Sequence, residues 1–155
     1  MIAPYIHAGG KIGVLVAVSG ADRSNAAVAS LAKDLAMQVA AANPTYIGRN
    51  DVPPPVVERE KAIYREQARA SGKPDKILDK IADGKLEKYF GDFCLVEQSF
   101  IKDSDRKVSQ FLADAGKAAG APITVSAFVR FQVGEGMEKR SDDLAAEVAK
   151  QLGQG

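Results

Sequence analysis

The sequence predicts an α+β protein, in which a small antiparallel sheet packs with helices and an antiparallel helical hairpin is inserted. Two segments predict the sheet: residues 12–18 are apolar and β-branched, and residues 123–133 alternate between side-chain types. A third segment, residues 55–92, predicts the hairpin, because 17 of its 38 residues are charged and its apolar positions recur at helical spacing. This mixture of elements is typical of a single α+β domain with a projecting part.

The strand predicted at residues 12–18 follows the glycine-rich sequence HAGGK, which contains His7, the single histidine of the chain. Glycines that supply positive φ between two extended segments indicate a β-hairpin turn. A phosphate-binding loop would instead place its glycines after a strand, at the start of a helix. His7 is therefore either a surface turn residue or a contact to a partner.

The last strand is expected over residues 123–133, with one apolar side. This side would contain Ile123, Val125, Ala127, Val129, Phe131 and Val133.

Helical spacing predicts three helices outside the hairpin. The first follows Ser24 as N-cap, spans residues 25–42 and ends at Asn43 and Pro44. Residues 103–120 and 141–152 predict the other two, whereas residues 94–101 are expected to be extended. The buried stripe of the first helix would contain Val28, Leu31, Leu35, Val39 and Ala42.

The hairpin is expected to pair two helices across a narrow apolar seam, with a turn at residues 71–74. Its predicted seam positions are Val56, Ile63 and Ala70, Val57 and Tyr64, Ile77 and Ile81, and Leu78, Ala82, Leu86, Tyr89 and Phe93. The resulting organisation has four parts: a core subdomain at 1–54 and 93–140, the hairpin at 55–92, and a C-terminal helix module at 141–155.

Composition and motifs exclude several classes of function. A net charge of +1 argues against a broad nucleic-acid footprint, and no run approaches the roughly 18 apolar residues of a membrane helix. The single Cys94 lies among large apolar residues, which favours a buried thiol in a reducing compartment. Asp103 and Asp105 are expected to cap the following helix and not to form a calcium loop, because the positions where such a loop needs a third oxygen donor, a glycine and a glutamate hold other residues. We therefore expect no metal, no cofactor and no enzymatic site.

Several stretches together closely resemble the elongation factor Ts family of bacteria and organelles. They cover nearly the whole chain in the order of the family: YIHAGGKIGVLV, LAKDLAMQVAAANP, VVEREKAIYREQARASGKPDKILDKIADGKLEKYF, CLVEQSFIKD and FVRFQVGEGMEK. The resemblance implies a guanine nucleotide exchange factor that binds elongation factor Tu and promotes release of GDP without covalent chemistry. It also implies a location in the cytoplasm or inside an organelle.

The resemblance also implies the residues that contact the partner. His7, with Gly9 in the same turn, matches a family turn that faces elongation factor Tu. Phe100, Ile101 and Lys102 match a second segment near that interface. Two residues of the terminal helix, Leu144 and Val148, match the module that packs on the nucleotide domain of elongation factor Tu.

The sequence departs from the family in two ways. The amino-terminal helical domain is missing, and the Thr-Asp-Phe-Val motif is replaced by SGADRSNAAV at residues 19–28. The chain resembles the second core half, the hairpin and the C-terminal module of family members with two core halves. Binding to elongation factor Tu is then expected, with impaired exchange activity. The alternative is a structural module that forms a homodimer or docks to a larger assembly through its hairpin, without exchange activity.

Overall fold

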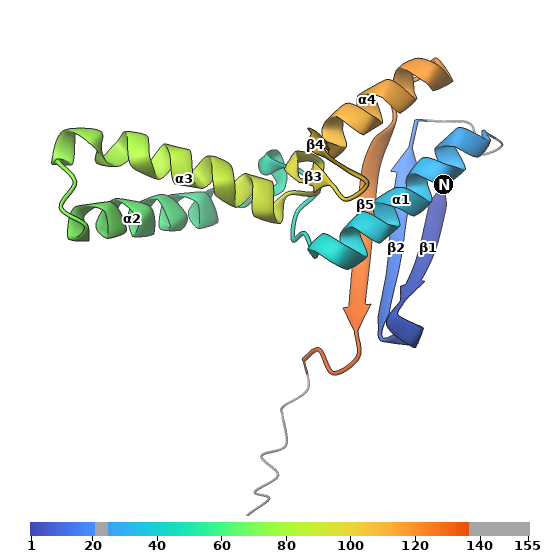
Figure 1. Ribbon diagram of the computed structural model, residues 1–155, viewed down its shortest axis with the longest axis horizontal. Coiled ribbons are helices and arrows are strands. Elements are labelled where there is room, and N and C mark those ends of the chain that lie inside the picture. Colours follow the sequence, from blue (N-terminus) through green and yellow to red (C-terminus); the bar gives the residue numbers. More distant parts are fainter. Residues whose placement is uncertain (21–24, 137–155) are drawn as a thin grey trace, which may run out of the picture.

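A computed structural model describes residues 1–20 and 25–136 of the chain. It confirms the predicted α+β class: a three-stranded antiparallel sheet packs with helices, and two long helices extend away from this core (Figure 1). A second sheet of two short strands lies beside the core helices.

The main sheet has the order β1-β2-β5, with β1 at Ile2–His7, β2 at Ile12–Ser19 and β5 at Thr124–Gln132. Both pairings are antiparallel, and β2 is the central strand. One face of this sheet, which we call the inner face, packs on the helices. Its buried side chains on β1, β2 and β5 are Ala3, Val14, Val16, Val18 and Val125.

A β-bulge in β5 overturns the prediction that one side of residues 123–133 is uniformly buried. Val18 pairs with Val125, but the adjacent Ala17 pairs with Ala127, so Ser126 is the extra residue. The extra residue reverses the alternation of side chains along the strand. Ile123 and Val125 are therefore buried, whereas the odd-numbered residues Ala127, Val129, Phe131 and Val133 that follow the bulge are exposed.

Helix α1 spans Ala26–Ala42 and supplies much of the core. Its N-cap is Asn25, whose side-chain oxygen accepts bonds from the backbone N–H groups of Ala27 and Val28, so the prediction of Ser24 as N-cap was wrong. The predicted end is confirmed, because Asn43 adopts a left-handed conformation with φ of 45°. Four of the five predicted stripe residues are buried, and the exception is the exposed Ala42.

The prediction of one helix over residues 103–120 was wrong at its start. Asp103–Lys107 forms strand β4, which pairs with β3 at Ser99–Phe100, and helix α4 begins only at Val108 and ends at Ala119. The cap comes from Gln110, whose side-chain oxygen accepts a bond of 2.8 Å from the Lys107 backbone N–H. Asp103 and Asp105 therefore belong to the strand and do not cap the helix. Residues 95–97, expected to be extended, form a short 3-10 turn.

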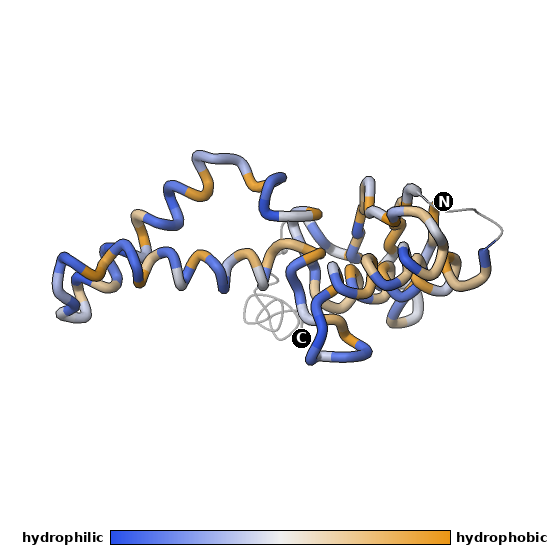
Figure 2. The backbone as a smooth tube through the Cα atoms, turned by 90° about the horizontal axis from the view of Figure 1, so that it is seen from above, coloured by the Kyte–Doolittle hydropathy of each residue, from blue (hydrophilic) through white to orange (hydrophobic). Residues whose placement is uncertain are grey.

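Helices α2, at Pro54–Ala70, and α3, at Leu78–Phe93, run side by side and form a projecting arm (Figure 1). Hydrophilic and hydrophobic residues alternate along it (Figure 2). The seam agrees with the prediction at Leu78, Ala82 and Leu86, which are buried, and differs from it elsewhere. Ile63 and Ala70 face solvent while Ala68 is buried, and on α3 the buried aromatic residue is Phe90, with Phe93 40% exposed. No helix in the described ranges combines the length and the hydropathy needed to cross a membrane.

Candidate functional site

The predicted turn around His7 is a tight connection between β1 and β2. Ala8, Gly9 and Gly10 have φ values of 51°, 64° and 92°, all in the left-handed region that favours glycine. His7 is exposed at the end of β1, and its Nδ1 shares a hydrogen bond of 3.0 Å with the Tyr5 hydroxyl. The two rings also stack, with centroids 5.9 Å apart. Tyr5 therefore holds the orientation of the imidazole at the surface.

The second predicted segment separates into a buried residue and two exposed residues. Phe100 is only 2% exposed and packs on Phe111 with ring centroids 4.1 Å apart, so its side chain belongs to the core. Ile101 is 43% exposed, and Lys102 is paired with Asp34 of α1 at 2.6 Å. Phe100 therefore anchors the turn that presents Ile101 and Lys102.

One cavity of about 390 Å³ brings the two predicted segments together. It is formed where the turn of the β1–β2 hairpin meets the C-terminal end of α1 and the β3–β4 turn. His7 and Ile101, 94 positions apart in the sequence, both line it. The complete lining is Tyr5, His7, Ile12, Met37, Ala40, Ala41, Ile101 and Arg130. We call this the His7–Ile101 cavity.

Arg130 supplies the positive charge of the His7–Ile101 cavity. It comes from β5, and its Nε donates a bond of 3.4 Å to the carbonyl oxygen of Ala40 near the end of α1. One Nη donates to Gln132 at 2.8 Å. The cavity thus combines apolar walls with a guanidinium and an imidazole, a combination that fits an apolar partner side chain with a hydrogen-bond acceptor or an acidic group nearby.

A buried glutamine, Gln38, positions the exposed turn and was missed by sequence reasoning. It is 1% exposed, and its Nε2 donates to the Gln98 side-chain oxygen at 3.1 Å and to the Ser99 carbonyl at 3.2 Å. Its Oε1 accepts a bond of 2.8 Å from the Ile101 backbone N–H. A signal was available, because Gln38 follows Leu35 by three positions and so falls on the predicted buried stripe of α1.

A second cluster connects the arm to the core through Arg49. Its guanidinium pairs with Glu87 of α3 at 3.0 Å and with Glu97 of the 3-10 turn at Leu95–Glu97. The same group lies 4.8 Å from the centre of the Phe90 ring. Hydrogen bonds from Arg49 lower the pKa of the Glu97 carboxyl and raise the pKa of Arg49 itself. Arg49 therefore holds the base of the arm against the core.

Cys94 is fully buried, as predicted, and burial raises the pKa of its thiol to about 11. A thiol of this pKa is a poor nucleophile at neutral pH. Within residues 1–20 and 25–136, no cluster of three or more histidine, cysteine or acidic side chains has a metal-binding arrangement.

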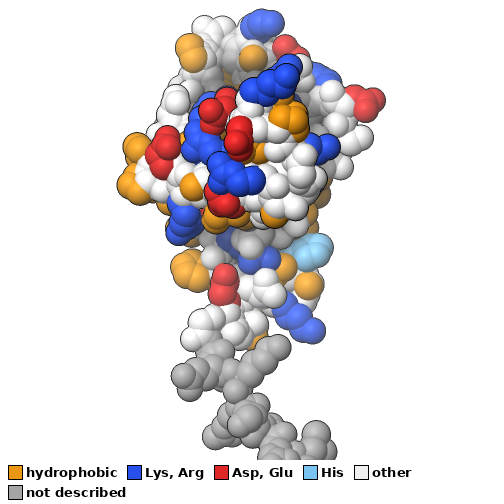
Figure 3. Space-filling model, turned by 90° about the vertical axis from the view of Figure 1, so that its left-hand side faces the viewer, with side chains coloured by type: hydrophobic (Ala, Val, Ile, Leu, Met, Phe, Trp, Pro, Cys, Tyr) orange, Lys and Arg blue, Asp and Glu red, His pale blue; other side chains and the backbone are white. Residues whose placement is uncertain are grey.

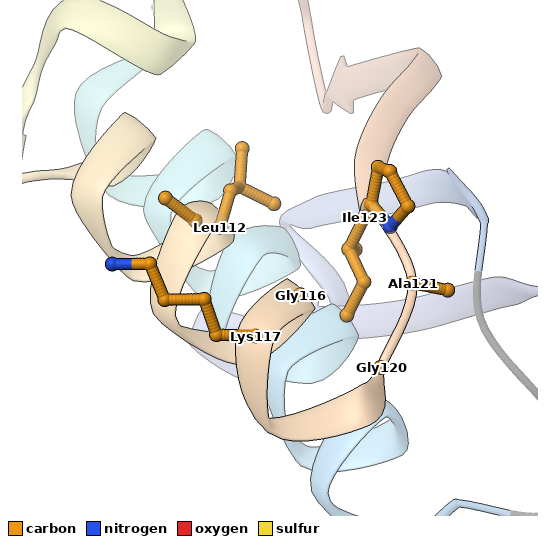
Figure 4. A pocket seen from close by; sticks show the side chains of 8 residues that line it. Leu112, Gly116, Lys117, Gly120, Ala121 and Ile123 are labelled. Atoms are coloured by element: carbon orange, nitrogen blue, oxygen red, sulfur yellow. The ribbon is translucent and has the colours of Figure 1, made fainter.

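Another cavity, of about 420 Å³, lies between α4 and the segment that leads into β5 (Figure 4). Gly116 allows the close approach of the two, since a Cβ atom there would lie 3.1 Å from the carbonyl oxygen of Ala121. Of the eight residues that line it, Lys117 alone is charged. The cavity thus lacks the convergent polar groups of a catalytic site.

Two of the predicted contact residues, Leu144 and Val148, lie outside the described residues. Gly9 lies in the turn after His7, where its φ of 64° is a left-handed conformation that this tight turn requires. The described candidate site is therefore the His7–Ile101 cavity together with Lys102.

Comparisons with known proteins agree with the family resemblance. The sequence model of the family described as Elongation factor TS matches residues 1–135. The protein named elongation factor Ts from Syntrophotalea carbinolica is 52% identical over 148 residues, which cover 96% of this chain and 49% of the relative. The one from Magnetococcus marinus is 49% identical over 150 residues, with coverage of 97% and 49%. The chain spans about half the length of the curated relatives that it matches. On the match of the family model over most of its length, the chain belongs to the elongation factor Ts family.

Proposed function

We propose that this chain binds elongation factor Tu and weakens the affinity of that protein for GDP. Membership of the family supports the choice of partner, and the His7–Ile101 cavity is the observation that carries the proposal. Residues from both segments that the family resemblance implicates line that one cavity. We infer a location in the cytoplasm or inside an organelle, where translation takes place.

The proposed mechanism is a linkage between two binding equilibria and needs no covalent step. If the chain binds nucleotide-free elongation factor Tu more tightly than the GDP-bound form, the affinity of elongation factor Tu for GDP must fall by the same factor when the chain is bound. Ile101 would enter an apolar site on the partner, while His7 and Arg130 would meet acceptor or acidic groups. The absence of the Thr-Asp-Phe-Val motif from the sequence leads us to expect binding with weak acceleration of GDP release.

The test measures release of a fluorescent GDP analogue from elongation factor Tu, together with binding of the chain to nucleotide-free elongation factor Tu. We expect His7→Ala and Ile101→Ala each to weaken binding about 10-fold, which corresponds to about 1.4 kcal/mol. Ile63→Ala is a matched control, because Ile63 is 41% exposed on the arm and Ile101 is 43% exposed at the site. Gln38→Leu should also weaken binding, since it removes the acceptor that holds the Ile101 N–H.

Three results would contradict all or part of the proposal. Absence of both binding and accelerated release would remove elongation factor Tu as the partner. Equal losses for Ile101→Ala and Ile63→Ala would remove the His7–Ile101 cavity as the contact. Binding without accelerated release would support the contact and refute the exchange activity of this chain.

The alternative function is a dimerisation or assembly module that acts through residues 55–92. The projection of the arm and its exposed Ile63 favour this alternative (Figure 1). Against it, basic and acidic side chains are intermixed over the arm (Figure 3). Two ion pairs, Lys61–Asp83 and Arg65–Asp79, join its own helices. Light scattering on the chain and on a deletion of residues 55–92 separates the two functions, since self-association through the arm requires the mass to fall to one chain.

A further inference from the structure

Four polar side chains lie together at one end of the inner face of the main sheet, which is apolar along the rest of its length. Tyr5 of β1 and Arg130 of β5 share one row, because both pair with the same residue of the central strand β2. His7 and Gln132 share the next row for the same reason. Residues two positions apart on a strand point to the same face, so the two rows are adjacent. Three of the four side chains line the His7–Ile101 cavity.

The hydrogen bond between Tyr5 and His7 determines which nitrogen of the neutral imidazole carries the proton. It joins the Tyr5 hydroxyl to Nδ1 at 3.0 Å, and the Tyr5 ring is itself packed on the core. A neutral imidazole has one N–H and one unprotonated nitrogen, and the partner of one nitrogen selects the tautomer. A phenol O–H is a stronger donor than an imidazole N–H, and the imidazole nitrogen is the more basic acceptor. The hydroxyl therefore donates to Nδ1, and the proton of the ring stays on Nε2.

We propose that Tyr5 is a positioning residue that keeps His7 as a hydrogen-bond donor through Nε2, and that the partner group bound at this cavity is a carboxylate. The inference rests on the proposed function, since it names the chemistry of the group that elongation factor Tu brings to the site. Arg130, like the Nε2–H group, can only donate. Among the described residues its partners are the Ala40 carbonyl and Gln132, which are both neutral, and no acidic side chain lines the cavity.

A wall that offers only donors selects for one class of partner group. A carboxylate has two oxygens, so it can accept a bond from the imidazole and a charge-assisted bond from the guanidinium. An amine or a guanidinium of the partner would find no acceptor on His7 or Arg130 and would be disfavoured. If the proton were on Nδ1 instead, Nε2 would present a lone pair, which repels a carboxylate. The Tyr5 hydroxyl thus decides whether the cavity accepts an acidic group.

The first test observes the tautomer directly, because His7 is the single histidine of the chain. The whole chain, labelled with nitrogen-15 histidine, is measured by NMR at about pH 9, where histidine side chains are neutral. We expect a protonated Nε2 and an unprotonated Nδ1. Tyr5→Phe keeps the ring but removes the hydroxyl, so the two nitrogen signals should move toward each other as the tautomers exchange. Tyr64→Phe removes a hydroxyl from α2 and should leave both signals unchanged.

The second test measures binding of the same variants to nucleotide-free elongation factor Tu. Tyr5→Phe should weaken binding about 3-fold, because it removes one hydrogen bond that orients the imidazole. A residue that acts through His7 has no separate effect once the imidazole is gone, so Tyr5→Phe with His7→Ala should bind like His7→Ala alone. Tyr64→Phe is again the control, and circular dichroism shows whether each variant is folded.

The third test examines the charge of the partner group. Arg130→Gln should weaken binding about 10-fold, and Arg130→Glu about 100-fold, because the second variant places a carboxylate opposite a carboxylate. Arg59→Glu makes the same reversal of charge on the arm, where the Arg59 side chain is 66% exposed, and should weaken binding less than about 2-fold.

Each part of the inference can be overturned separately. A proton on Nδ1 in the wild-type chain, or signals that Tyr5→Phe does not move, would remove the role of Tyr5. Losses from Tyr5→Phe and His7→Ala that add in full would do the same. Equal losses for Arg130→Gln and Arg130→Glu would remove the carboxylate while the proposed function stands. A wild-type chain that does not bind elongation factor Tu would refute the proposed function and the carboxylate together, and the NMR spectrum would then decide the role of Tyr5 by itself.

Discussion

The core and the arm are stabilised by different interactions, although both contain helices packed on apolar residues. The core surrounds α1, where Leu35, Ala36 and Val39 have no exposed surface. The arm has one thin seam, in which Ala82 is fully buried and Leu86 and Phe90 are each 7% exposed. Ion pairs across its surface, such as Lys61–Asp83 and Arg65–Asp79, supplement this seam. The core therefore depends on buried area, whereas the arm has little of it.

This difference indicates which contacts fix the orientation of the arm relative to the core. Exposed ion pairs contribute little to stability, so those along α2 and α3 cannot fix the direction of the arm relative to the core. The base of the arm is different, because Arg49 contacts Glu87 on α3 and Glu97 on the core side. The nearby residues Val52, Leu86, Phe90 and Cys94 form a separate buried cluster. We infer that this base, rather than the length of the arm, sets its orientation.

The largest effect on stability is expected when a leucine is truncated to alanine in the core. The same truncation in the arm should cost less. Leu35→Ala should lower the free energy of unfolding by about 2–5 kcal/mol, because it leaves a cavity where no solvent enters. Leu86→Ala should cost about 2 kcal/mol, since the thin arm can close around the missing atoms. Urea unfolding followed by circular dichroism measures both values. Equal losses at the two positions would show that the arm is packed as tightly as the core.

An intermediate effect is expected at Arg49, and it depends on pH. Arg49 lowers the pKa of the Glu97 carboxyl below its ordinary value of 4.5. A lowered pKa in the folded state means that the stabilisation is present above about pH 4.5 and is lost as the pH falls through the folded pKa. Arg49→Met should therefore cost on the order of 1 kcal/mol at pH 7 and less at about pH 3.

Urea unfolding of wild type and Arg49→Met at both pH values measures this difference. Arg49→Lys is the control, because it keeps a positive charge but loses the two-pronged contact with Glu87 and Glu97. The free energy of unfolding of Arg49→Lys at pH 7 should lie between those of wild type and Arg49→Met. If wild type and Arg49→Met lose the same stability on acidification, the Arg49–Glu97 pair does not contribute to the base of the arm.

Sequence reasoning succeeded where structure depends on neighbours in the chain. The end of α1 at Asn43 and the turn after His7 both follow from local preferences of particular residues. It failed where strand pairing between distant segments decided the outcome. The alternation of residues 123–133 runs without interruption in the sequence, but pairing with β2 inserts a bulge at Ser126 and reverses its second half. Residues 103–107 contain helix-capping types, yet pairing with β3 makes them a strand.

The candidate site shows the same division. His7, Ile101 and Lys102 came from family resemblance, but their relation to one another requires the folded core. Gln38 connects Ile101 to the core by accepting a bond from its backbone N–H, and nothing in the sequence identifies Gln98 and Ser99 as the other partners of Gln38. The burial of Phe100 was missed because adjacent residues of a turn can point in opposite directions.

The smallest effect is expected for a single ion pair of the arm. Arg65→Ala removes the contact with Asp79, whose side chain is 75% exposed, and should change the free energy of unfolding by less than about 0.5 kcal/mol. Added salt should not enlarge this change, because exposed pairs are already screened by solvent and ions. Urea unfolding at low and high salt measures the loss of stability in Arg65→Ala and in Arg49→Met, so that the two losses can be compared. If Arg65→Ala costs as much as Arg49→Met, the ion pairs along the arm act as a network and not as separate surface contacts, and the orientation of the arm is then distributed over its whole length.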